Sequence, residues 1–218
     1  MITAIYAHKP GQGVTTIAAA LATLIANAGR RTLLVDTSTD LPAVLGINEH
    51  PDQRGLADYL TDTTVTLSDI ATPVTTNLDL ITRADPAPVL NASTFGLLTG
   101  ALDHYDTVII DAGTTAPEWV RHSTARVLVT RPCYLALRHA TGKRRPDYLA
   151  VITEPGRALN TADIEAAIGT PVTVTIGHAP DIRRAVDAGL LTMRLPRTLA
   201  RALAPLLAAI TTESVVAQ

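Results

Sequence analysis

Cysteine is almost absent from this chain, because Cys133 is the only one among its 218 residues. A single cysteine excludes a disulfide framework, and it also excludes zinc or iron–sulfur sites built from several cysteine ligands. Aromatic residues make up only 3% of the sequence, which argues against a stacking platform for single-stranded nucleic acid. The core must therefore be built from Leu, Ile, Val and Ala.

Long apolar runs are missing as well. No stretch of about 18 apolar residues occurs, so we expect no transmembrane helix. The first apolar segment, residues 2–6, has no cationic leader before it and so lacks the pattern of a secretory signal. With 47% hydrophobic and 17% charged residues, the composition excludes a disordered chain. We therefore expect a soluble, cytoplasmic protein that folds as one α/β domain over residues 1–218.

The formal net charge of −2 conceals an uneven distribution. Residues 1–109 hold 5 basic and 11 acidic side chains, whereas residues 110–218 hold 13 basic and 9 acidic ones. The segment between Glu118 and Asp147 contains no carboxylate, and its cations are Arg121, Arg126, Arg131, Arg138, Lys143, Arg144 and Arg145. Such a segment suits contact with phosphates, or it forms a solvated rim whose acidic partners lie elsewhere in the fold.

Short apolar segments alternate with helical patterns along the chain. Strands are expected at residues 2–7, 31–35, 78–82, 107–110, 127–130, 149–153 and 172–176. Helices are expected from Thr15 or Thr16 to residue 28, and at 42–45, 56–60, 92–102, 163–168 and 182–188. An apolar stripe from Leu199 to Ile210 predicts a last helix, which Pro205 should kink or split. The alternation predicts a three-layer αβα fold, with a mostly parallel twisted sheet and helices on both faces.

A glycine-containing turn joins the first expected strand to the first expected helix, and it reads His8-Lys9-Pro10-Gly11-Gln12-Gly13-Val14-Thr15-Thr16. Phosphate-binding loops need this context, because backbone N–H groups and a helix N-terminus converge on the phosphate and glycines allow its close approach. The usual pattern places a lysine directly before a Ser/Thr that ligates Mg²⁺. Here Thr15 is present, but Val14 stands at the lysine position.

Two aspartates follow later strands in the same way. Asp36 closes Leu33-Leu34-Val35, and Asp111 closes Thr107-Val108-Ile109-Ile110. Because ligands of parallel sheets bind outside the carboxyl ends of the strands, the turn and both carboxylates are expected at one site. The alternative is that the glycines serve only the connection and that the aspartates only cap or terminate elements.

These motifs resemble the ParA/MinD family of deviant Walker A P-loop ATPases, including its TadZ/CpaE-like branch. The family loop reads K-G-G-x-G-K-T-T: Lys9, Gly11, Gly13, Thr15 and Thr16 match it, whereas Pro10 replaces a glycine and Val14 the ordinary lysine. Asp36 is similar to the first aspartate of the family's Asp-x-Asp element, and Ser38 replaces the second, which orients the attacking water. Residues 105–111 resemble the family's Walker B strand, and residues 179–189 the stretch after its late strand.

The resemblance implies a P-loop NTPase-like fold and ATP with Mg²⁺ as cofactors. The residues it implies for nucleotide binding are Lys9, Gly11, Gln12, Gly13, Val14, Thr15 and Thr16. Thr15 and Asp111 would hold the metal, and Lys9 and Asp36 are the candidate catalytic residues. It also implies a homodimer with a partner protein, acting in DNA partition (plasmid or chromosome segregation) or in spatial localisation.

Two departures from the family pattern predict weakened cofactor binding and little or no hydrolysis. A cation about 4 Å from a phosphate contributes about 4 kcal/mol before desolvation, and Val14 cannot supply it. Phosphoryl transfer depends almost wholly on positioning and charge neutralisation, and Ser38 cannot replace the water-orienting carboxylate. We therefore expect a pseudo-ATPase that still binds nucleotide.

Two other interpretations remain open. In the family the signature lysine reaches across a dimer, so an active ATPase could use Lys9 in trans. The chain could also be a nucleotide-free scaffold or localisation platform for a pilus or secretion machine. Non-specific DNA contact, which phosphates dominate, is expected from Arg138, Lys143, Arg144 and Arg145. The C-terminal stretch at residues 206–213 carries no cation, so membrane contact of the MinD kind is not expected.

Overall fold

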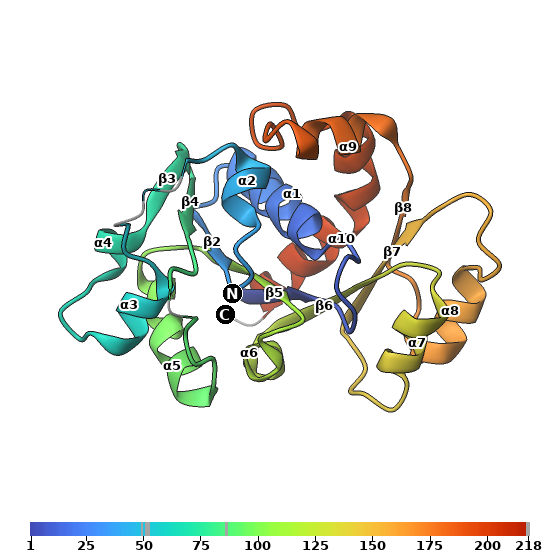
Figure 1. Cartoon of the computed structure of the whole chain (residues 1–218), viewed down its shortest axis with the longest axis horizontal. Coiled ribbons are helices and arrows are strands. Elements are labelled where there is room, and N and C mark those ends of the chain that lie inside the picture. Colours follow the sequence, from blue (N-terminus) through green and yellow to red (C-terminus); the bar gives the residue numbers. More distant parts are fainter. Residues whose placement is uncertain (49, 51–52, 86, 217–218) are drawn as a thin grey trace.

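The computed structural model describes residues 1–48, 50, 53–85 and 87–216. Within them, eight strands form one sheet in the order β3-β4-β2-β5-β1-β6-β7-β8 (Figure 1). The strands are β1 Ile2–Tyr6, β2 Thr32–Asp36, β3 Thr72–Thr75, β4 Leu78–Ile81, β5 Thr107–Gly113, β6 Ala125–Thr130, β7 Tyr148–Thr153 and β8 Val174–Gly177. Only β3 runs antiparallel to its neighbour among these described strands. The mostly parallel sheet predicted from the alternation of segments is confirmed.

Helices cover both faces of the sheet. They are α1 Val14–Asn27, α2 Leu41–Leu45, α3 Leu56–Thr61, α4 Leu67–Ile70, α5 Ala92–Thr99, α6 Pro117–His122, α7 Tyr134–Ala140, α8 Thr161–Ile168, α9 Pro180–Asp187 and α10 Arg197–Val216, with a 3₁₀ turn at Gly100–Asp103. One buried cluster joins α1, α2, α9 and α10 to one face. The other cluster joins the six helices from α3 through α8 to the opposite face of the sheet. The two helical layers and the sheet are the three layers that the sequence predicts.

Alternation along the strands explains the two clusters. In β1, Ile5 belongs to the α1 side, whereas Ala4 and Tyr6 belong to the α6 side. Successive side chains of a strand point to opposite faces, and a parallel sheet covered on both faces therefore reads as a nearly continuous apolar run. The central strands of this chain have that pattern, with β2 buried from end to end.

Several elements differ from the expectations. The structure adds α4, α6, α7 and the edge strand β3, which the sequence patterns did not indicate. Pro73 lies in β3. An edge strand tolerates proline, because the missing N–H faces away from the neighbouring strand and no ladder hydrogen bond is lost. The first helix begins at Val14, one or two residues earlier than expected.

The last helix was predicted to kink or split at Pro205, and the splitting is wrong, because α10 continues through it to Val216. Leu199 and Leu203 before the proline and Leu206 and Ile210 after it are fully buried, so both halves of the helix are held by packing against the core. Pro205 itself is exposed, and the hydrogen bond that it cannot donate is lost on the solvent side.

No helix in the described part of the chain is both long and apolar enough to cross a membrane.

Candidate functional site

Residues 7–13 connect β1 to α1 at the carboxyl edge of the sheet (Figure 1). Gly11 and Gly13 have φ of +75° and +94°, a left-handed backbone that glycine adopts without steric cost. The N-terminus of the 14-residue α1 has no side-chain cap. Its first N–H groups, which have no partner within the helix, are therefore available to an anion.

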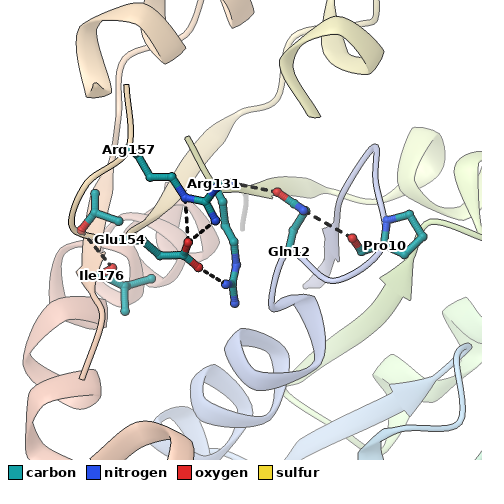
Figure 2. A network of polar contacts seen from close by, with 7 residues as sticks. Pro10, Gln12, Arg131, Glu154, Arg157 and Ile176 are labelled. Carbon is teal, nitrogen blue, oxygen red and sulfur yellow. Dashed lines mark hydrogen bonds and ion pairs between the residues drawn. The ribbon is translucent and has the colours of Figure 1, made fainter. Parts of the chain in front are cut away.

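Gln12 fastens this loop to the end of β6. Its Oε1 accepts a bond of 2.9 Å from the backbone N–H of Arg131, and its Nε2 donates to the carbonyl of Pro10 at 3.3 Å (Figure 2). The side chain is buried, with 4% exposure. Gln12 therefore positions the loop and offers a ligand only its backbone.

Arg131 continues the same network toward β7. Its guanidinium pairs with the Glu154 carboxylate, which also accepts a bond of 2.8 Å from Nε of Arg157 (Figure 2). These three side chains come from the loops that follow β6 and β7. The network ties the glycine turn to the neighbouring strand ends.

Two carboxylates lie at the ends of adjacent strands. Asp36 of β2 and Asp111 of β5 are register partners, and both are fully buried. Asp36 accepts backbone bonds from Ser38, Thr39 and Leu41 at 2.7, 2.8 and 3.1 Å. It thereby holds a tight loop in which Thr39 has φ of +96°, a costly conformation for a non-glycine residue that the surroundings must impose.

Burial raises the pKa of Asp111 to about 7, and the nearby Asp36 charge acts in the same direction. Hydrogen bonds from the Thr15 and Ser38 hydroxyls and from the Gly113 N–H offset part of this effect. Burial also raises the pKa of Asp36. Two buried carboxylates this close favour a shared proton or a bound cation, because both cannot stay ionised without compensation.

Ser38 lies between the two carboxylates. Its Oγ is 3.2 Å from Oδ1 of Asp36 and 3.3 Å from Oδ2 of Asp111. A hydroxyl has one proton to donate, so it satisfies only one of them at a time. A bridging hydroxyl, and not a third carboxylate, therefore lies between Asp36 and Asp111.

A cavity of about 240 Å³ opens over the glycine turn. Its walls are residues 9–15, Ser38, Asp40 and residues 113–115. Among these lining residues Lys9 is the one cation. Val14 is 7% exposed and packs in the α1-side core, so no positive charge comes from that position.

A second cavity, of about 190 Å³, also meets the start of α1 but shares no lining residue with the first. The sequence patterns did not predict it. Thr16 and Arg131 meet there with Ile152, Ile176 and the first turns of α9. The segment 179–189, which resembles the family stretch, could have indicated this cavity, because residues 179, 182, 183, 186 and 187 line it.

The basic segment divides into groups. Arg126 pairs with Asp147, which directly follows the segment, and Arg131 pairs with Glu154 from the loop after β7. These two cations therefore have acidic partners, although Arg126 is mostly buried and does not lie on a solvated rim. Arg138 is exposed on α7, and the Arg145 guanidinium lies against Gly169 at the end of α8.

The other cations, Lys143 and Arg144, line a separate cavity with Arg121.

Solved structures with this arrangement of strands and helices identify the fold. No protein-family model matches the sequence, and no curated protein matches it. A chain of the MinC:MinD cell division protein complex from Aquifex aeolicus matches with a TM-score of 0.81 at 17% identity, over 97% of this chain and 96% of that one. The fold is that of the MinD and ParA ATPases.

Two further structures with the ParA/MinD fold agree. A ParA family ATPase from Chlorobium tepidum matches with a TM-score of 0.76 at 21% identity, over 95% of this chain and 97% of that one. MinD from Pyrococcus horikoshii, solved with Mg-ADP, matches with a TM-score of 0.75 at 19% identity, over 96% and 95%. The ParA/MinD fold therefore extends over nearly the whole chain.

Proposed function

We propose that this chain is a nucleotide-binding positioning protein of the ParA/MinD type, which binds ATP with Mg²⁺ and hydrolyses it slowly or not at all. The observation that carries the proposal is the uncapped start of α1, beside the Thr15 hydroxyl and the buried Asp111 carboxylate. Helix N-termini bind phosphates, and hydroxyl and carboxylate oxygens are the ligands that Mg²⁺ prefers. The site therefore offers N–H groups for a phosphate and oxygen ligands for Mg²⁺ next to each other.

The residues present fit a nucleotide with its metal. Thr15 and Asp111 would hold Mg²⁺, with backbone N–H groups of residues 11–16 on the phosphates. The metal, when bound, neutralises phosphate charge. The cavity beside Thr16 offers apolar surface from Ile152 and Ile176, which suits the base. A protein of the same fold was solved with Mg-ADP, which agrees with this assignment.

The same site lacks groups that turnover needs. Val14 leaves the phosphates without the ordinary lysine, and Ser38 offers no carboxylate to a water. Asp36 already accepts three backbone N–H groups, so its role is to position the 37–41 loop. Lys9 remains as the cation for a phosphate, in its own chain or across a homodimer.

Restoring the missing groups tests the proposal. We expect the unaltered chain to bind ATP in a Mg²⁺-dependent way in calorimetry, and Thr15→Ala to weaken this binding at least tenfold. Val14→Lys should tighten binding at least tenfold, because it adds a cation worth several kcal/mol next to a phosphate. Val14→Leu, a matched apolar change, should not. Binding of ATP to neither the unaltered chain nor Val14→Lys would favour the nucleotide-free scaffold.

The alternative of an active ATPase has its own test. If Lys9 acts across a dimer, Lys9→Ala abolishes phosphate release and ATP-dependent dimerisation measured by sedimentation. Under our proposal the unaltered chain releases little phosphate with or without Lys9. Phosphate release that depends on Lys9 would therefore replace the pseudo-ATPase with the trans mechanism.

For the positioning role, we propose that Arg138, Lys143, Arg144 and Arg145 contact non-specific DNA. All four are exposed, and contacts to phosphates make such binding strongly salt-dependent. Random duplex DNA should be retarded in a gel, and changing Lys143, Arg144 and Arg145 to Ala should abolish the shift. Arg201→Ala, an exposed cation on α10, is the control. A MinC:MinD complex with the same fold supports a partner protein for this chain as well.

A further inference from the structure

A third cavity, of about 400 Å³, lies on the opposite face of the sheet from α1. Tyr6 of β1 and Arg126 of β6 form its floor, and both side chains point to the face that carries α6 and α7. The walls are Pro117, Val120 and Arg121 from α6, with Lys143 and Arg144 from the loop before β7. In Figure 1, α6 and α7 lie on the side of the sheet opposite to α1.

The floor of the cavity holds a donor without an acceptor. Arg126 binds Asp147 through Nε, at 2.8 Å from Oδ2, and through Nη2. Its Nη1 is buried, and within the described residues it has no hydrogen-bond partner. A buried guanidinium N–H without an acceptor is costly, and because Arg126 lines the cavity, an acceptor bound in the cavity is one way to satisfy this donor.

The walls hold cations without carboxylates. Arg121, Lys143 and Arg144 form no ion pair in the part of the chain that the structure describes. The Asp147 carboxylate is already used by Arg126. A cavity that gathers three unpaired cations around a buried donor is complementary to a group with more than one negative charge.

The rest of the lining is apolar. The Tyr6 ring, Pro117 and Val120 contribute surface that suits an aromatic or aliphatic body. We propose that this cavity binds a small phosphorylated molecule, with its phosphate on Arg126 Nη1 and the surrounding cations and its apolar body against Tyr6 and Val120. A phosphate of duplex DNA would stay at the rim, because the rigid duplex cannot bring it to a buried donor.

This site is separate from the nucleotide cradle. The cavity shares no lining residue with the one over the glycine turn or with the one beside Thr16. It is therefore independent of the proposed nucleotide binding, but it shares Lys143 and Arg144 with the proposed DNA contact. It does include His8, which directly precedes Lys9.

Calorimetry with phenyl phosphate and the full chain tests the proposal. We expect one bound molecule per chain, and at least tenfold weaker binding in Arg121→Gln and in Lys143→Gln. Arg201→Gln, which removes an exposed cation elsewhere, should bind as the unaltered chain does. Thr15→Ala should also leave binding unchanged, because Thr15 does not line this cavity. The variant serves as a control, since phenyl phosphate bound at the nucleotide site would depend on Thr15. Binding that survives Arg121→Gln and Lys143→Gln, or that is lost in Thr15→Ala, would overturn the proposal, and so would no binding at all.

A second variant separates charge from shape. Val120→Trp fills the apolar wall and keeps every cation, so it should abolish phenyl phosphate binding while leaving the retardation of duplex DNA intact. The thermal unfolding of each variant shows whether it is folded. If Val120→Trp binds phenyl phosphate as the unaltered chain does, the cavity is not the site. If duplex DNA competes with phenyl phosphate and both are lost together in Arg121→Gln, the surface belongs to DNA instead.

Discussion

At the scale of single residues, the centre of the site is a pair of buried carboxylates whose charges are not balanced by any cation of the chain among the described residues. Asp36 is occupied by the backbone of its own loop, whereas Asp111 faces two hydroxyls and one N–H. This difference makes Asp111, and not Asp36, the group that gains most from a bound metal. It also makes Asp111 a source of pH dependence.

The raised pKa of Asp111, about 7 against an ordinary 3.8, predicts how stability varies with pH. Because the folded state favours the protonated acid, this stabilisation is present below about pH 4 and is lost as the pH rises through 7. Asp111→Asn should therefore stabilise the metal-free chain at pH 8 by at most about 4 kcal/mol, since one pKa unit corresponds to about 1.4 kcal/mol.

Urea unfolding of the two proteins at pH 5 and pH 8 measures this effect. The gain from Asp111→Asn should shrink at the lower pH, and the variant should lose Mg²⁺-dependent ATP binding. An Asp111→Asn variant that is equally destabilised at both pH values would show that the carboxylate is fully satisfied in the folded chain.

His8 gives a second prediction at this scale. Burial lowers the pKa of its imidazole, and the charges of Lys143 and His139 lower it further. Removing one cation should favour the protonated ring, so Lys143→Gln should raise the pKa of His8, and Arg201→Gln should not. Titration of the ring resonances by NMR measures both. An unchanged pKa in Lys143→Gln would mean that the two side chains are not close in solution.

The sequence predicts part of the site at this scale and misses the rest for a physical reason. Lys9 and Thr15 line one cavity, as their spacing in one short turn requires. The tether from Gln12 to Arg131 joins residues 119 positions apart, and the orphaned Nη1 of Arg126 depends on how Asp147 approaches it. Contacts of this kind depend on side-chain geometry, which no local pattern records.

At the scale of elements, buried parallel strands were the easiest to predict and short surface helices the hardest. The central strands are short but nearly continuous apolar runs, and both of their faces are covered. The helices α6 and α7 have only six and seven residues, too few to show a helical period. Tertiary packing, through Trp119 and Leu137 for example, decides that they form.

The continuous α10 gives a prediction of its own. Proline inside a helix costs about 3 kcal/mol relative to alanine, and the lower flexibility of the unfolded chain returns up to about 1 kcal/mol of it. Pro205→Ala should therefore raise the free energy of unfolding by about 1–2 kcal/mol. The matched control is Pro42→Ala, because Pro42 lies in the first turn of α2, where proline is tolerated. Equal effects of the two changes in urea unfolding would contradict this explanation.

At the scale of the whole molecule, the three cavities described above lie on different sides of the sheet. The two that meet the start of α1 form the proposed nucleotide site, and the third lies on the α6 side. The uneven charge of the sequence has a structural counterpart here, since the basic segment supplies Arg131 to the cavity beside Thr16 and every lysine and arginine of the third cavity. The fold alone does not assign these roles, because one fold hosts many functions.

The central claim is that the chain holds ATP with Mg²⁺ without cleaving it, and a single-turnover experiment tests this most directly. Excess full-length chain is mixed with trace ATP labelled on the γ-phosphate, and bound and released label are followed over time, beside the Val14→Lys/Ser38→Asp double variant. We predict that the unaltered chain keeps its bound ATP intact, and that the double variant releases phosphate at least a hundredfold faster. Release at the same rate from both would contradict the account.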